Sequence, residues 1–176
     1  MVTTTEFNMV HDTSAPVIKD DQTWRYGEQP AGTTTVSLAL NVFENASDTL
    51  KAKYLVGYDD AGTQVAIRSG IPLAKITSGA NKGLYGPYDS TAEDGRNSKI
   101  EGLLESNIPV TVTIKGWAAK VDAVGMRYRG DIITENLPVD VTGAVWAGDF
   151  WAVDQSDGSV TMLPHEKPAV SGGGAG

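Results

Sequence analysis

Short hydrophobic segments, each closed by a turn-forming residue, constrain the fold of this chain more than any other feature of its sequence. The clearest is Pro109–Gly116, in which Val110, Val112 and Ile114 alternate with polar residues. This two-residue period is typical of a β-strand with one buried face. The 20 glycines and 8 prolines supply many turns and favour strands over long helices. We therefore predict a mainly β chain that folds as a small compact β-barrel or sandwich.

Several other segments share this pattern. Thr35–Phe43 alternates well, and the side chains expected on one face of its strand are Val36, Leu38, Leu40 and Val42. Further strands are expected at Leu50–Tyr58 and Val65–Ile67, followed by an apolar group at Ile71–Ile76, with a final strand pair within Val139–Val153. Lys99–Glu105 and Trp117–Val124 fit either a strand or a short helical segment. Apolar neighbours indicate core or subunit-interface positions for Trp117, Trp146 and Trp151.

The two ends of the chain are more polar than its middle. We interpret residues 1–34 as an extended N-terminal arm whose short islands dock on a partner; the residues concerned are Val17, Ile18, Trp24, Arg25 and Tyr26. An arm packed on its own domain, or a disordered leader, fits the same composition. Residues 35–163 are expected to form one β domain, and residues 164–176 a flexible C-terminal tail.

Charge and cysteine content exclude several classes of function. The net charge is −8, which disfavours binding to nucleic acid or to an anionic membrane. The chain has no cysteine, so it can hold neither a disulfide nor a thiolate site. The first residues lack the basic and apolar regions of a signal peptide, and no apolar stretch approaches the ~20 residues that span a bilayer. We therefore expect synthesis in a cytoplasm.

Sequence motifs for catalysis or metal binding are weak. The two histidines, His11 and His165, fall in the predicted arm and tail, where a general base or metal ligand is rarely held. No glycine motif for phosphate binding follows a predicted strand. Asp89 and Asp94 could hold calcium, but their spacing does not fit the EF-hand loop, and turn-forming roles are favoured. We expect no catalytic residue, no metal and no cofactor.

Residues 69–116 contain short segments in a distinctive order. An apolar segment, Pro72–Ile76, is followed by a Tyr-x-Pro-Tyr-Asp step, a glycine turn, a Gly-Leu-Leu-Glu segment and the strand Val110–Ile114. In this order they resemble the phage lambda-type head (capsid) decoration family. The positions that carry the resemblance are Pro72, Tyr85, Pro87, Tyr88, Asp89, Asp94, Gly95 and Gly102.

The resemblance implies a β-tulip-like domain that forms homotrimers on the outer surface of a virion, at three-fold and quasi-three-fold positions of the expanded capsid. It also implies an N-terminal arm that becomes ordered on binding and adds a strand to the sheets of the major capsid protein. This chain differs from the family pattern in its additional sequence after Pro138 and in an arm without an alignable motif.

Three hypotheses about function follow. The first is a capsid decoration (cementing) protein, made in the host cytoplasm, with the major capsid protein and its own copies as partners and no enzymatic activity. The second is a carbohydrate- or cell-surface-binding β module, which the four tryptophans and six tyrosines suggest. The third is an enzyme that uses paired carboxylates across a cleft, chosen from Asp89, Asp94, Glu101 and Glu105.

Overall fold

The structure is a computed structural model that describes residues 19–28, 30–57 and 64–165. Val17, Ile18, His11 and residues 166–176 of the predicted tail lie outside the described residues. The elements, in chain order, are β1 (Thr33–Ala39), α1 (Leu40–Glu44), α2 (Asp48–Tyr54), β2 (Leu55–Val56), β3 (Gln64–Ile67), β4 (Pro72–Lys75), β5 (Tyr85–Pro87), β6 (Gly102–Leu104), β7 (Ile108–Thr113), β8 (Gly116–Trp117), β9 (Val121–Arg127), β10 (Arg129–Ile132), the 3-10 turn η1 (Thr134–Asn136), β11 (Asp149–Val153) and β12 (Val160–Met162).

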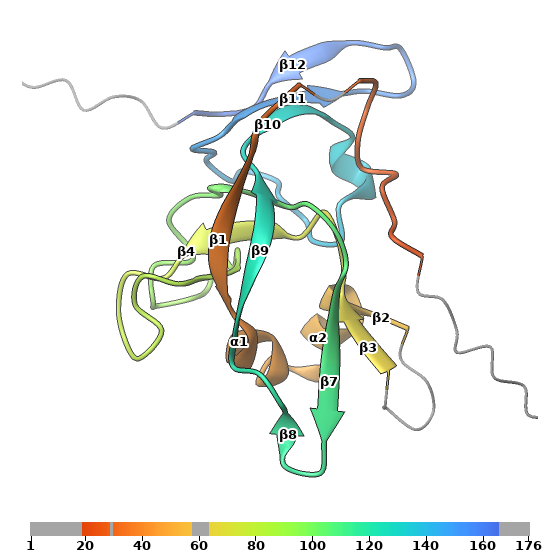
Figure 1. The fold of residues 1–176 in the computed structure, drawn as a ribbon. Helices are drawn as coiled ribbons and strands as arrows, with labels where there is room; N and C mark the ends of the chain where they lie inside the picture. Colours follow the sequence, from red (N-terminus) through yellow and green to blue (C-terminus); the bar gives the residue numbers. More distant parts are fainter. Residues whose placement is uncertain (1–18, 29, 58–63, 166–176) are drawn as a thin grey trace, which may run out of the picture.

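A closed barrel, with strands in the order β1-β5-β4-β6-β9, forms the centre of the described chain (Figure 1). β1 runs antiparallel to β9 along its whole length, from Thr33 opposite Arg127 to Ala39 opposite Val121. β5 pairs parallel with β1, whereas the remaining neighbours in the barrel pair antiparallel. The predicted mainly β fold with a small barrel is therefore confirmed.

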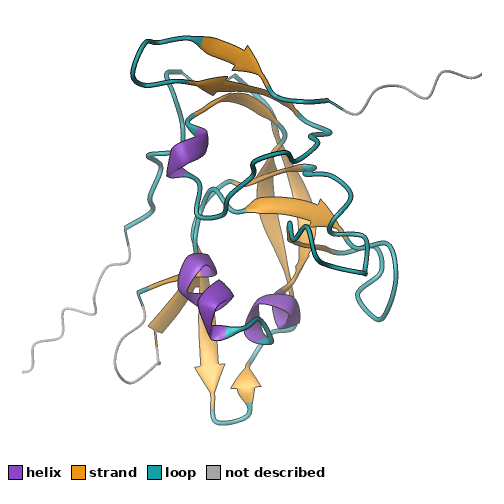
Figure 2. Ribbon diagram, turned by 180° about the vertical axis from the view of Figure 1, so that it is seen from behind, coloured by secondary structure: helices purple, strands orange, loops and turns teal. Residues whose placement is uncertain are grey.

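One end of the barrel carries a four-stranded sheet in the order β2-β3-β7-β8, together with helices α1 and α2 (Figures 1 and 2). The side chain of Ser47 caps α2 by accepting a hydrogen bond from the Leu50 backbone N–H. Phe43 of α1 meets Tyr54 of α2 edge to face, with ring centroids 5.5 Å apart. Both rings are buried, so the two helices close this end of the barrel core.

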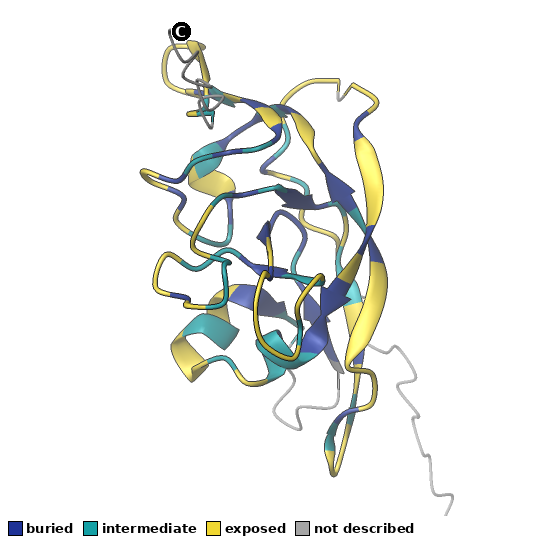
Figure 3. Ribbon diagram, turned by 90° about the vertical axis from the view of Figure 1, so that its left-hand side faces the viewer, coloured by how far each residue is buried: buried dark blue, intermediate teal, exposed yellow. Residues whose placement is uncertain are grey.

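The other end carries a three-stranded sheet in the order β10-β11-β12 (Figure 1). β10 and β11 are parallel, and β12 returns antiparallel to β11. A second cluster of buried side chains belongs to this end: Trp24, Ile100, Leu103, Ile132, Leu137, Val141, Ala144, Trp146 and Phe150. In Figure 3, buried residues are concentrated in the strands at the centre of the molecule, and exposed residues lie along the outer strands and loops. The described chain thus has two hydrophobic clusters joined by the barrel strands.

Two predicted strands are partly helical. The strand predicted at Thr35–Phe43 ends at Ala39, and α1 takes over its last hydrophobic residues. Of Leu50–Tyr58, the part up to Tyr54 belongs to α2, and only Leu55–Val56 is a strand. A short apolar run can bury one side in either conformation, so its periodicity alone does not separate them. Here the Ser47 cap begins a helix that the pattern did not indicate.

The other predicted segments have mixed outcomes. The strands at Val65–Ile67 and Pro109–Gly116 are present as β3 and β7, and the apolar group Ile71–Ile76 contains β4. The two ambiguous segments contain β6 and parts of β8 and β9. Ile114 is wrongly assigned to a buried face, because it lies in the turn after β7 and is fully exposed. The predicted pair within Val139–Val153 is also wrong: β11 pairs with β10 and β12 instead. Trp117 and Trp146 are buried, whereas Trp151 is 41% exposed.

The carboxylate of Glu44 should make part of the protein's stability depend on pH. It accepts hydrogen bonds from Lys120 Nζ at 2.7 Å and from the Trp117 backbone N–H at 2.8 Å, and these hold the pKa of Glu44 below its ordinary value of 4.5. A carboxyl pKa lowered by folding stabilises the folded state above the unfolded pKa, and this contribution is lost as pH falls through the folded pKa. We expect the Tm of Glu44→Gln and of Lys120→Met to decrease less than that of the unmodified protein between about pH 5 and pH 2. Calorimetry measures this decrease. Curves parallel to that of the unmodified protein would contradict this assignment.

Candidate functional site

Residues 19–26, which we call the docked segment, lie against the domain and contain three of the predicted partner-binding residues. Their backbone extends the β10 edge: Arg25 forms an antiparallel bridge with Ile132. The Ile133 N–H donates to the Trp24 carbonyl at 2.8 Å, and the Tyr26 N–H donates to the Asp131 carbonyl at 3.1 Å. The docked segment is therefore fixed by main-chain hydrogen bonds in addition to its side chains.

Trp24 fills a socket at the second hydrophobic cluster. Its side chain is only 1% exposed, and its indole Nε1–H donates to Ser69 Oγ at 2.8 Å. The Ser69 hydroxyl in turn donates to the Asp21 carbonyl at 2.6 Å, which connects the socket to the start of the docked segment. Gly70 has a φ of +75°, and a Cβ there would lie 2.6 Å from Trp24 Cδ1. The socket therefore requires glycine both for its backbone conformation and for its space.

A cluster of three charged side chains holds the docked segment beside the barrel. Arg127 of β9 is 6% exposed, and it pairs with both carboxylate oxygens of Glu105, at 2.9 and 2.8 Å. Arg25 reaches the same carboxylate at 3.0 Å and donates to the Glu105 carbonyl at 2.6 Å. Burial lowers the pKa of Arg25, an effect that Glu105 opposes. Glu105 thus joins the docked segment to a barrel strand.

The first described residues are also anchored. The side-chain amide of Asn107 donates to the Lys19 carbonyl at 3.0 Å, and its backbone N–H donates to Asp20 Oδ1 at 3.1 Å. Asn107 Oδ1 accepts from the Ser69 N–H at 2.8 Å, so this one residue contacts both Lys19–Asp20 and the socket of Trp24. Asn107 therefore ties the first described residues, Lys19 and Asp20, to the domain.

The structure decides between the two interpretations of the predicted arm for its described part. Trp24 and Arg25 pack on their own domain, as in the alternative that the composition left open, so the indole is not an exposed anchor for a partner. Tyr26, at 45% exposure, lies at the surface. The residues that bind the docked segment were not predicted as its partners: Ser69, Glu105 and Asn107. The sequence holds no local signal for them, because they lie 45 to 88 positions along the chain from the residues they bind.

The positions that carry the family resemblance lie together around β4 and mostly build the barrel. Pro72 begins β4, and Tyr85 and Pro87 belong to its antiparallel neighbour β5. The Tyr88 N–H donates to the Pro72 carbonyl at 2.7 Å. Gly102 begins β6 on the other side of β4, and a Cβ there would lie 2.3 Å from the Arg127 carbonyl oxygen. These residues therefore have structural roles in closing the barrel.

The remaining positions that carry the resemblance form turns. Asp89 accepts hydrogen bonds from the backbone N–H and the hydroxyl of Thr91, at 2.9 and 2.7 Å. Asp94 pairs with Arg96 at 3.0 Å, and Gly95 follows it in the same turn. Glu101 lies 4.0 Å from Lys99. With Glu105 bound by two arginines, each of the four carboxylates considered for catalysis has a partner within the domain.

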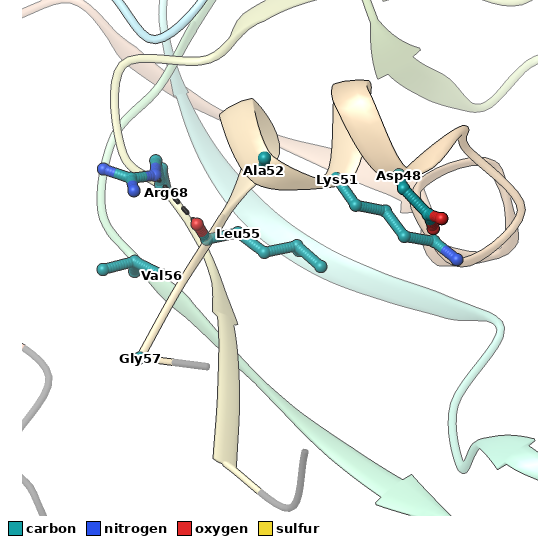
Figure 4. A pocket seen from close by; sticks show the side chains of 7 residues that line it. All are labelled: Asp48, Lys51, Ala52, Leu55, Val56, Gly57 and Arg68. Atoms are coloured by element: carbon teal, nitrogen blue, oxygen red, sulfur yellow. Dashed lines mark hydrogen bonds between the residues drawn. The ribbon is translucent and has the colours of Figure 1, made fainter. Parts of the chain in front are cut away.

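A cavity of about 500 Å³ lies beside α2 and β2 (Figure 4). Leu55, Val56 and Ala52 supply apolar lining, and Arg68 Nε donates to the Leu55 carbonyl at 2.9 Å. Arg68 also contributes to lowering the pKa of Asp21, whose largest cause is the Thr23 backbone hydrogen bond. Arg68 therefore lines the cavity and also acts on the electrostatics of the docked segment.

No protein-family model, curated protein or solved structure matches the chain. Within residues 19–28, 30–57 and 64–165, no group of three or more His, Asp or Glu side chains is placed to hold a metal ion. In the same residues, no helix has the length and apolarity needed to cross a membrane. The docked segment and its socket are therefore the candidate site defined by geometry.

Proposed function

We propose that this protein is a phage capsid decoration (cementing) protein without enzymatic activity. In this proposal it is made in the host cytoplasm and binds the outside of the expanded head as homotrimers, at three-fold and quasi-three-fold sites. It stabilises the head against the pressure of packaged DNA. Its partners are the major capsid protein and its own copies. The resemblance of residues 69–116 to the lambda-type decoration family supports this proposal.

The observation that carries the proposal is the firm attachment of the docked segment. A segment that grips a neighbouring subunit transmits force only if its other end is fixed to a folded domain. Trp24 in its socket and Arg25 on Glu105 provide such a fixed end, and Asn107 holds Lys19. We assign Trp24 and Arg25 to anchoring, and the capsid contact itself to the residues before Lys19, which include Val17 and Ile18.

Physical chemistry is consistent with this role. A protein that binds only the expanded lattice stabilises that lattice by mass action. A trimer with three leading segments gains avidity from contacts that are individually weak. Strand addition relies on main-chain hydrogen bonds, so it needs no distinctive side-chain motif. A net charge of −8 also limits adhesion to DNA.

Deletion of residues 1–18 should abolish attachment to the capsid and leave the domain folded. The docked segment keeps all of its described contacts in this variant, so we expect an unchanged near-UV circular dichroism spectrum. Attachment is measured by co-sedimentation with expanded heads of the phage that encodes the protein, and the trimer by analytical ultracentrifugation. Deletion of residues 166–176 is the matched control and should bind normally. If the variant lacking residues 1–18 binds as well as this control, the proposed role of the leading segment is wrong.

A further inference from the structure

The outer face of the three-stranded sheet carries an exposed aromatic ring at its centre. Residues that pair directly across a ladder share one face of the sheet. Trp151 of β11 pairs with Met162 of β12 on one side and with Asp131 of β10 on the other. Asp149, two residues before Trp151, pairs with Arg129 and shares the face. Trp151 and Met162 are 41% and 46% exposed, so an apolar pair lies beside charged groups at the surface.

This face is hollowed and rests on a rigid support. A cavity of about 410 Å³ is lined by Trp151, Met162 and Pro30 together with Arg129, Asp131 and Asp149. Phe150, the neighbour of Trp151 in β11, is fully buried and packs on Trp146 with ring centroids 5.0 Å apart. Because β11 is hydrogen-bonded on both sides, the Trp151 backbone is fixed. Side chains of a binding site are positioned more precisely on such regular elements than on loops.

We propose that this face binds a neutral oligosaccharide. The indole of Trp151 offers a flat apolar surface on which the C–H face of a sugar ring can stack, and Met162 extends that surface. The Asp149 carboxylate is 70% exposed beyond its contact with His165 Nε2 at 3.2 Å, so it can accept hydrogen bonds from sugar hydroxyls, and the guanidinium of Arg129 can donate to them. Two carboxylates in the cavity and a net charge of −8 disfavour sialylated or uronic-acid glycans. The inference goes beyond capsid decoration, because it concerns a ligand outside the shell.

The same face is poorly suited to the alternative of a subunit interface. Stable protein interfaces bury about 800 Å² on each partner, around a centre depleted in charge. Here Arg129, Asp131 and Asp149 line the cavity beside the indole. A flat protein partner would have to desolvate these charged groups, whereas the hydroxyls of a sugar can hydrogen-bond to those that remain exposed.

The test is titration of the full-length protein with maltohexaose, cellohexaose and chitohexaose. Trp24, Trp117 and Trp146 are buried, so a bound sugar should change chiefly the fluorescence of Trp151. We expect saturable binding of at least one probe, also detected by calorimetry. Trp151→Ala should weaken it by about tenfold or more, equivalent to ~1.4 kcal/mol. Asp149→Asn, at a side chain that is 70% exposed, should weaken it while leaving the fold intact.

The control is Ile114→Ala, which removes another exposed hydrophobic side chain, in the β7–β8 turn at the opposite end of the molecule (Figure 1). It should bind the sugar normally. Absence of binding to all three probes at millimolar concentration would overturn the proposal, as would equal binding by Trp151→Ala. Loss of the homotrimer in Trp151→Ala without any sugar binding would identify the face as a subunit interface instead. None of these outcomes depends on whether the protein binds capsids.

Discussion

Replacing Trp24 with alanine is expected to lower the free energy of unfolding by about 3–5 kcal/mol. The substitution empties a socket in which the indole is 1% exposed and packs with Ile132 and Phe150 in the second hydrophobic cluster. It also removes the hydrogen bond from Nε1 to Ser69 Oγ. Urea denaturation followed by circular dichroism measures the loss. Because the docked segment would then be held mainly by Arg25 and Asn107, attachment to expanded heads should also weaken.

Two further variants separate the contributions of the indole. Trp24→Phe keeps most of the apolar volume and loses the N–H donor, so we expect a smaller cost of about 1–3 kcal/mol. Trp151→Ala is the matched control, because it makes the same substitution at a position that is 41% exposed. It should cost about 1 kcal/mol or less. Equal losses for Trp24→Ala and Trp151→Ala would show that the socket does not stabilise the domain.

Strands with one buried face could be predicted from the sequence. Positions at which the chain passes from a strand into a turn or a helix could not. Val36 and Leu38 alternate with polar neighbours and lie in the barrel core as expected. Ile114 continues the alternation of β7, but β7 ends at Thr113, and Ile114 and Lys115 form the turn to β8, so the buried face ends one step early. Leu50 lies in a helix because of the Ser47 cap, a local signal that apolar alternation conceals.

The candidate site was predicted only in part, because its partners are distant in sequence. Trp24 stands out as an aromatic residue in a polar region, and the sequence shows that it must contact something. The socket is built by Ser69 and Gly70, which look like an ordinary turn between two strands. A hydrophobic residue in a polar segment has the same pattern whether it binds its own domain or another protein. Only the fold, which brings Ser69 to the docked segment, separates the two.

Replacing Glu105 with glutamine is expected to lower the free energy of unfolding by about 3 kcal/mol, since removing one partner of a buried ion pair leaves the other charge uncompensated. The Arg127 side chain is 7% exposed and that of Glu105 is 21% exposed, so solvent screens this pair only weakly. Arg25 loses its ionic partner at the same time and keeps its bond to the Glu105 carbonyl. Hydrogen exchange should therefore rise in the docked segment, which links the barrel strand β9 to the stability of the anchor.

A double-mutant cycle tests whether the charge itself is responsible. Arg127→Met removes the buried guanidinium, so the double variant Glu105→Gln, Arg127→Met should be less destabilised than the sum of the single variants, by about 1–3 kcal/mol. Lys99, which lies 4.0 Å from Glu101 with both side chains more exposed, provides a comparison pair at the surface. Glu101→Gln should change stability by about 0.5 kcal/mol or less. Strict additivity of the Glu105 and Arg127 variants would mean that the charge of this pair does not contribute to stability.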